Sequence, residues 1–308
     1  MAKITWRFSV RSSQPEIGVT GTLQGNSIGL ELPTHDEVRR LAVDAGFETK
    51  GWIKKEENRE NARIEVLEPA DSPRMARILA LIEEKYGFRA NPNGVFDMSR
   101  SRELFGVQRV RKYSRSEMDG AEYLSFGMVR FIAHAAFRDQ QQFAADSYVV
   151  RDFRKSAKTN LMGCLSPFHA IALNGDMKNR LEAYGLVGAN FNDEVGGSCG
   201  ELWKFGSSIV LPRCLTRLVN GQGRDVDHPD DWRIHTEQLY DDGCRPVSIR
   251  YMRCDFQAIG RFDVAMQREF VGNHQAGAYR GCLVSQRFRR ILKDLGIRGT
   301  HYVPVALE

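Results

Sequence analysis

One sequence pattern occurs twice in this chain, first in the middle and again at the C-terminal end. Aligned without gaps, residues 172–191 and 283–302 share an N-cap residue, apolar residues at every fourth position and two glycines three positions apart. This pattern predicts a short helix, capped by Asn174 or Ser285 and ended by a glycine, followed by an extended segment. The repeat therefore predicts a feature of the fold: two similar helix–turn–strand units that can pack around a shared sheet.

Elsewhere the patterns predict strands and short helices in an irregular order. Residues 4–10 alternate between apolar and polar, as a half-buried strand does. Ser72 followed by Pro73 predicts a helix start, and Ser114 with Glu117 predicts a capping box.

These elements show no regular strand–helix–strand rhythm, so we expect an α+β fold with mainly antiparallel sheet and a duplicated helix–turn–strand unit. Residues 247–256 alternate like one long strand, and residues 139–146 are the best candidate for a linker. We therefore expect an N-terminal α+β domain over residues 1–145. A C-terminal α+β domain over residues 146–308 would hold both copies of the repeat.

Composition narrows the class of protein. The 308 residues are 42% hydrophobic, which is ordinary for a globular protein, and no apolar run reaches the roughly 18–20 residues that span a bilayer. The N-terminus lacks the apolar core of a signal peptide, so we expect a cytoplasmic protein with no membrane partner. A formal net charge of +5 is small for this length, so we do not expect nucleic acid as a partner.

Motifs for metals and cofactors are missing from the sequence. The six cysteines form no CxxC pair and the seven histidines show no HxxxH or HxH spacing. No glycine-rich phosphate loop occurs either. We expect buried, reduced thiols, no bound metal and no cofactor.

The second copy of the repeat carries a resemblance to a known family. Its segment has the form VS-x-R-(L/F)-x3-L-x3-G-(L/I)-x-G followed by a Pro-Val ending. The residues that match are Val284, Ser285, Arg287, Phe288, Leu292, Gly296, Ile297, Gly299, Pro304 and Val305. Together with similar stretches across about the C-terminal two-thirds, this segment resembles polymorphic-toxin immunity proteins, notably the double-CxxCG immunity type, and related uncharacterised bacterial proteins. The CxxCG pairs themselves are missing here, so the resemblance carries over no metal role.

The resemblance implies a bacterial protein that binds a cognate protein toxin and neutralises it without catalysis. Each matching residue also has a structural interpretation: Ser285 caps a helix, Phe288 and Leu292 pack in the core, and Gly296 and Gly299 form turns. A motif that holds the fold does not say which surface contacts the partner.

The sharpest candidate for that surface is an acidic segment. Residues 220–243 contain seven acidic residues and two arginines, whereas residues 245–298 contain eleven basic residues and four acidic ones. Charge complementarity speeds association, so this segment could meet a basic toxin. The candidate partner-binding residues are Asp225, Asp227, His228, Asp230 and Asp231. A calcium site is not expected there, because no EF-hand spacing occurs.

Two alternatives remain open from sequence. Cys199 lies in a glycine-rich stretch that partly resembles the surroundings of a papain-like nucleophilic cysteine. If the protein is an enzyme of unknown chemistry, Cys199 and the region of His228 are the only candidate site that the sequence gives. No base can be assigned to this thiol from sequence, so we name no catalytic residue. The other alternative is a regulatory interaction module.

Overall fold

The structure is a computed structural model of the whole chain, and its contacts divide the chain into two compact units. We call residues 2–112 with 242–246 the N-terminal unit, and residues 113–241 with 247–308 the C-terminal unit. The residues that the structure describes are 3–11, 35–47, 63–69, 71–86, 105–137, 148–153, 162–166, 170–191, 202–216, 218–219, 238–239, 244–245, 249–273 and 277–308.

In its described residues, the N-terminal unit is a four-stranded sheet with two helices. Its strands are β1 (Lys3–Arg11), β2 (Arg63–Pro69), β3 (Phe105–Lys112) and β14 (Cys244–Arg245). They lie in the order β14-β3-β1-β2, where β1 is antiparallel to both neighbours and β14 is parallel to β3.

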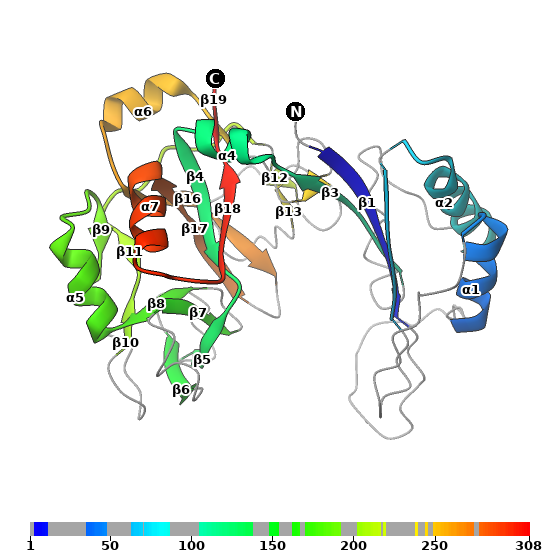
Figure 1. Cartoon of the computed structure of the whole chain (residues 1–308), viewed down its shortest axis with the longest axis horizontal. Helices are drawn as coiled ribbons and strands as arrows, with labels where there is room; N and C mark the ends of the chain where they lie inside the picture. The colour runs from blue at the N-terminus through cyan, green and yellow to red at the C-terminus, as the bar shows by residue number, and fades with distance from the viewer. Residues whose placement is uncertain are drawn as a thin grey trace. The chain divides into compact units, whose positions relative to one another are not determined.

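The helices of this unit are α1 (His35–Asp44) and α2 (Pro73–Tyr86), which lie side by side (Figure 1). The predicted start of α2 is confirmed: Ser72 Oγ accepts a hydrogen bond from the Met75 amide at 3.4 Å and donates one to Glu68 at 2.8 Å. Met75, Ile78 and Ile82 form the buried face of the helix.

The C-terminal unit contains most of the strands, many of them short. They are β4 (Tyr123–Met128), β5 (Phe131–Phe137), β6 (Tyr148–Phe153), β7 (Met162–Ser166), β8 (Ile171–Asn174), β9 (Ala189–Asn190), β10 (Leu202–Lys204), β11 (Gly206–Ser207), β12 (Leu218–Val219), β13 (Gln238–Leu239), β15 (Arg250–Tyr251), β16 (Val264–Asn273), β17 (Gly277–Ser285), β18 (Thr300–Pro304) and β19 (Ala306–Leu307). Its helices are α4 (Arg115–Gly120), α5 (Gly175–Ala183), α6 (Arg253–Ile259) and α7 (Gln286–Asp294).

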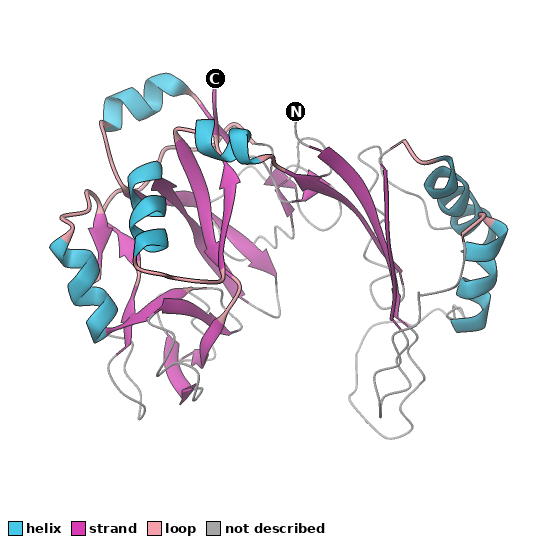
Figure 2. Cartoon of the chain, viewed as in Figure 1, coloured by secondary structure: helices cyan, strands magenta, loops and turns pink. Residues whose placement is uncertain are grey.

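Two sheets organise the C-terminal unit. One has the order β16-β17-β4-β18 and is antiparallel throughout. The other has the order β10-β8-β7-β5-β6, in which only β5 and β7 run parallel. Helices and mainly antiparallel strands alternate irregularly along the chain, so the fold is α+β as predicted (Figure 2). In the described part of the chain, no helix is both long and apolar enough to cross a membrane.

The first of these sheets is buried on both faces. Successive side chains of a strand point to opposite faces, and Leu124 and Phe126 belong to one core cluster whereas Tyr123 belongs to another. On the first face, Phe288 of α7 stacks on Phe205 at 5.3 Å and meets Phe126 edge-on at 5.4 Å. On the second face, Tyr123 stacks on Phe262 with ring centroids 4.4 Å apart.

The division between the units lies between Lys112 and Tyr113, whereas the sequence pattern placed a domain boundary after residue 145. Strand pairing explains the difference, because β4 pairs with β17 and β18, and β5 pairs with β7. Both strands thus belong with the C-terminal half of the chain. The predicted linker, residues 139–146, lies outside the described residues.

The predicted long strand over residues 247–256 is wrong beyond Tyr251. The chain turns into helix α6, which brings the ring of Phe256 to 5.1 Å from the ring of Tyr251, and both side chains are buried. Gly260, with φ of 82°, ends the helix. A continued strand would not place these two aromatic rings in contact.

The two copies of the repeat adopt the same local features. Asn174 and Ser285 are both extended N-caps, and they accept hydrogen bonds from the amides of Met177 at 2.9 Å and Phe288 at 3.2 Å. After each helix, two glycines with positive φ lead into a strand. Their φ values are 56° at Gly185, 87° at Gly188, 70° at Gly296 and 79° at Gly299.

The glycines after α5 give a test of this turn. A side chain at Gly188 would overlap the Val264 carbonyl oxygen, whereas nothing lies within 4 Å of the position a Cβ would take at Gly185. We expect Gly185→Ala to cost about 1–2 kcal/mol of unfolding free energy from left-handed strain alone. Gly188→Ala should cost roughly 1–3 kcal/mol more, because the Val264 backbone must move. Urea denaturation of both variants measures this difference, and equal losses would contradict it.

Candidate functional site

The residues predicted to bind a partner belong to the part of the chain that the structure does not describe. Asp225, Asp227, His228, Asp230 and Asp231 all lie outside the residues that the structure describes. Cys199, named for the enzyme alternative, lies outside them as well. The acidic segment thus stays a prediction.

The motif residues of the second repeat copy are all described, and they have structural positions. Ser285 caps α7, while Phe288 and Leu292 are buried in the core beneath it. Gly296 and Gly299 have positive φ, and Pro304 ends β18. The structural roles expected for Ser285, Phe288, Leu292, Gly296 and Gly299 are therefore confirmed.

Arg287, another motif residue, forms an ion pair with Asp263, the residue before β16. The Asp263 side chain is 7% exposed, and its Oδ2 accepts a hydrogen bond from Arg287 Nη1 at 2.6 Å. Asp263 Oδ1 accepts from the hydroxyl of Ser285 at 2.7 Å, and Oδ2 also accepts from the Val187 amide at 3.1 Å. Arg287 Nη2 donates to the Tyr184 carbonyl at 2.6 Å.

We call these groups the Asp263 hub: Asp263, Ser285, Arg287, Tyr184 and Val187. Tyr184 and Val187 belong to the turn of the first repeat copy, whereas Ser285 and Arg287 begin the helix of the second. Because a buried carboxylate is costly unless hydrogen-bonded, the hub stabilises the junction of the two copies. It is a structural site.

A second cluster of buried polar side chains lies in the middle of β16. Met266 pairs with Cys282 and Phe270 with Arg280, so residues 267–269 face the single residue Gly281. The strand therefore bulges, and a side chain at Gly281 would overlap Gln267. Gln267 and Glu269 are 2% and 1% exposed.

Glu269 fixes a neighbouring segment of chain. Its Oε1 accepts a hydrogen bond from the Cys214 amide at 2.6 Å, and its Oε2 has no hydrogen-bond partner among the described residues. Just before this contact, Leu211 donates its amide to the Met266 carbonyl at 2.9 Å. The segment 209–216 is thus bound to β16 by backbone bonds and then by the Glu269 carboxylate. A buried carboxylate at a strand bulge is costly, and such features occur next to functional sites.

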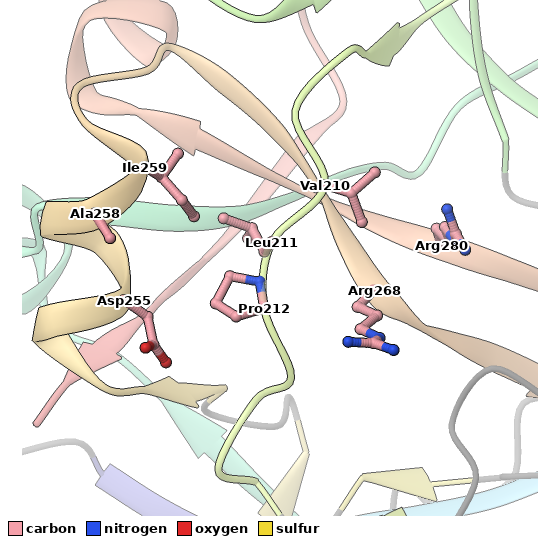
Figure 3. Close-up of a pocket in the computed structure, with 8 residues that line it drawn as sticks. All are labelled: Val210, Leu211, Pro212, Asp255, Ala258, Ile259, Arg268 and Arg280. Carbon is pink, nitrogen blue, oxygen red and sulfur yellow. The ribbon is translucent and has the colours of Figure 1, made fainter.

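A groove of about 700 Å³ lies against this bulge. Figure 3 shows Asp255 and Ile259 of α6 on one side, with Arg268 and Arg280 of β16 and β17 on the other. Val210, Leu211 and Pro212 of the segment bound by Glu269 also line the groove. This volume is within the range of ligand-binding pockets, so the groove and the bulge form the candidate functional site.

The described cysteine side chains near the core are poor nucleophiles. Burial raises the pKa of Cys164 to about 11 and raises that of Cys282 as well. The pKa of Cys214 is raised by burial and, to a lesser extent, by the nearby Glu269 carboxylate. A thiol must lose its proton to attack, so these three side chains are protected from that chemistry.

No set of three or more histidine, cysteine or acidic side chains within the described ranges is arranged to hold a metal ion. Sequence reasoning missed Asp263, Gln267, Arg268, Glu269 and Arg280. A polar residue within an apolar strand pattern is the only local signal that they give. This pattern does not distinguish a buried carboxylate from a solvent-exposed one. The burial of Glu269 depends on the strand bulge, which is a feature of the tertiary structure.

Comparison with protein-family models, with curated proteins and with solved structures finds no match to this chain.

The hub predicts unequal effects of two similar substitutions. Asp263→Ala removes the acceptor of Arg287, Ser285 and Val187, and we expect it to cost roughly 2–4 kcal/mol of unfolding free energy. Asp119→Ala removes an exposed carboxylate that also accepts from an arginine of α7, Arg289, at 2.8 Å. This control should barely change the denaturation midpoint. Equal midpoints for the two variants would contradict the role of the hub.

Burial also predicts a pattern of thiol labelling. At pH ~8 we expect iodoacetamide to label the exposed Cys254 in the folded protein and to spare Cys164, Cys214 and Cys282. In denaturant all four should react, because unfolding removes the burial that raises the pKa values. Mass spectrometry of peptides resolves the four sites. If Cys164 were labelled as fast as Cys254 in the folded protein, Cys164 would not be protected by burial, and the prediction would be wrong.

Proposed function

We propose that this protein is a cytoplasmic immunity protein, which binds a cognate bacterial toxin and neutralises it without catalysis. One observation supports the proposal. The residues that carry the resemblance form a single folded element, from the end of β17 through α7 to β18, anchored by Arg287 and Ser285 on Asp263. A match between residues that fold together is better support for kinship than a match between scattered residues.

Neutralisation would occur by occlusion, in which the bound protein covers the active site of the toxin. The acidic segment, residues 220–243, is a candidate contact because of its charge. Complementary charge accelerates encounter and selects the partner, and many cytotoxic nucleases are basic. The contribution of the acidic segment to the binding of the toxin should therefore weaken as salt concentration rises.

The test begins with the full-length chain as bait in a lysate of its native host. Each captured protein is then expressed alone and together with the bait in a susceptible bacterium. We expect one captured protein to be toxic alone and harmless in the presence of the bait. Survival that needs no physical complex, or no toxic protein among those captured, would contradict the proposal. A Cys199 thiol that reacts faster than Cys254 would instead favour the enzyme alternative.

Charge reversal tests the acidic segment. We expect the triple variant Asp227→Lys, Asp230→Lys and Asp231→Lys to weaken toxin binding at least tenfold at low salt without changing thermal stability, because surface charge governs encounter. The matched control reverses three exposed acidic residues of the N-terminal unit, Asp44, Asp71 and Glu84, and should bind as the wild type does. Calorimetry measures both affinities. Unchanged affinity in the first variant would remove the segment from the interface.

A further inference from the structure

A further strand of the C-terminal unit has a counterpart elsewhere in the chain. Residues 122–129 and 201–208 align without gaps, and each segment begins with a glutamate, two apolar residues, a polar residue, a phenylalanine and a glycine. β4 lies in the first of these segments, and β10 and β11 lie in the second. The similarity between the two parts of the chain therefore extends beyond the repeat helix and its turn.

Each of these strands lies between the two strands that flank a repeat helix. β4 pairs with β17 and with β18, which lie before and after α7 (Figure 1). β10 pairs with β8 and β11 pairs with β9, and these partners lie before and after α5. We call β4, and β10 together with β11, the middle strands. In both places the middle strand separates the strand before the helix from the strand after it.

The two middle strands have the same register against the repeat helices. Tyr123 pairs with Ser285, the N-cap of α7. Leu202 pairs with Asn174, the N-cap of α5. A shift of one residue in a register moves every side chain of a strand to the other face, so the two middle strands present equivalent side chains to the core.

The other ends of the middle strands match as well. The Val129 amide donates a hydrogen bond to the Gly299 carbonyl at 2.9 Å, and the Ser208 amide donates one to the Gly188 carbonyl at 3.0 Å. Gly299 and Gly188 are the second glycines of the two repeat turns, and both have positive φ. Both bonds thus follow from the alignment that relates the two repeat copies.

The chain after each middle strand continues the correspondence. The Cys164 amide donates to the Arg130 carbonyl at 2.8 Å, and the Met266 amide donates to the Ile209 carbonyl at 2.9 Å. In both places the next residue along the chain pairs in parallel with the same cysteine or methionine. β7 and β16 are therefore equivalent, and each forms a hairpin with the strand that enters a repeat helix.

Aromatic rings at equivalent positions of the middle strands contact each other. The rings of Phe126 and Phe205 lie 6.0 Å apart. Phe126 also contacts Tyr302 at 5.4 Å, and Phe205 contacts Phe191, the counterpart of Tyr302, at 5.9 Å. Equivalent residues contact each other where a twofold axis relates two copies of a structure. These rings therefore indicate an approximate twofold axis between the two phenylalanines.

The correspondences define a first module, residues 122–191, and a second module, residues 201–302. Their middle strands are exchanged: β4 of the first module lies in the sheet of the second, and β10 and β11 of the second pair with strands of the first. We infer that the C-terminal unit is a duplicated module in which each copy binds the middle strand of the other. The ligand of each module is an extended strand with alternating apolar side chains, as in donor-strand complementation.

Each donated strand supplies part of the core of the unit. Leu124 and Phe126 of one strand, and Leu202 and Phe205 of the other, are buried. Without the donated strand, the core would lose these side chains, and the backbone groups of the flanking strands would lose their hydrogen-bond partners. A module separated from the other should therefore not fold alone.

Disulfide trapping in the full-length protein tests the exchange. Gly127 of β4 pairs with His301 of β18, and the counterpart of His301 in the first module is Asn190, which pairs with Gly206. A Cβ at Gly127 would lie 3.5 Å from the His301 side chain, which is ordinary contact, so a cysteine fits there. The test variant carries Gly127→Cys and His301→Cys. The matched control carries Gly127→Cys and Asn190→Cys, the pair that an arrangement without exchange would bring together.

Under mild oxidation we expect the disulfide of the test variant to form at least about tenfold faster than that of the control, because only the first two residues are strand neighbours. Mass spectrometry of peptides identifies the bond, and thermal denaturation of the reduced variants checks that both are folded. A control disulfide that forms as fast as the test disulfide, or no test disulfide in the folded variant, would overturn the exchange.

Cleavage of the chain tests whether each module needs the strand of the other. A protease site is placed between residues 191 and 202 of the full-length protein, and after cleavage the two fragments are separated in urea. Each fragment is then returned to native buffer, alone or mixed with the other. Cys164 and Cys282 are buried thiols of the first and second modules, so their protection from iodoacetamide reports on the folding of each module.

We expect Cys164 and Cys282 to be labelled in the separate fragments and spared in the mixture, because only the mixture restores both middle strands. The exposed Cys254 should react in every sample and serves as the control. Protection of either buried thiol in its separate fragment, or labelling of both in the mixture, would overturn the inference.

Discussion

A single buried carboxylate, that of Asp263, joins the parts of the C-terminal unit that the sequence keeps far apart. It accepts hydrogen bonds from the Val187 amide, the Ser285 hydroxyl and the Arg287 guanidinium, while its own amide donates to the Val187 carbonyl at 2.9 Å. Several donors from different segments can converge on one carboxylate because its two oxygens offer about four acceptor positions. The turn after α5, the start of α7 and the start of β16 are therefore fixed to each other.

The position of the bulge in β16 is counted from the residue at which the strand begins. Asp263 fixes where the strand begins, and four residues later the register against β17 breaks at the bulge. Within the bulge, Glu269 faces inward and binds the Cys214 amide, whereas Arg268 lines the groove. One strand thus carries both the hub that stabilises the unit and the distortion that shapes its candidate binding surface. A shift of one residue in this register would exchange buried and exposed side chains along the strand.

Local patterns were read correctly where the physical cause is also local. Ser72, Ser114, Asn174 and Ser285 all cap helices, because an N-cap needs only a side-chain oxygen and an amide three residues away. The prediction of a strand through Phe256 was wrong because the alternation of apolar and polar residues stops at Met252. The following residues form α6, which packs Phe256 against Tyr251.

The sequence by itself determined the α+β class and the residues that cap several of the helices, because periodicity and capping act over a few residues. Only the tertiary structure decided that β4 and β5 belong with the C-terminal strands, that Asp263 receives Arg287, and that Arg268 and Arg280 share a groove with Asp255. These outcomes depend on hydrogen bonds and packing between segments distant along the chain. No short stretch of sequence encodes the partner that a strand, a buried charge or a bulge will meet.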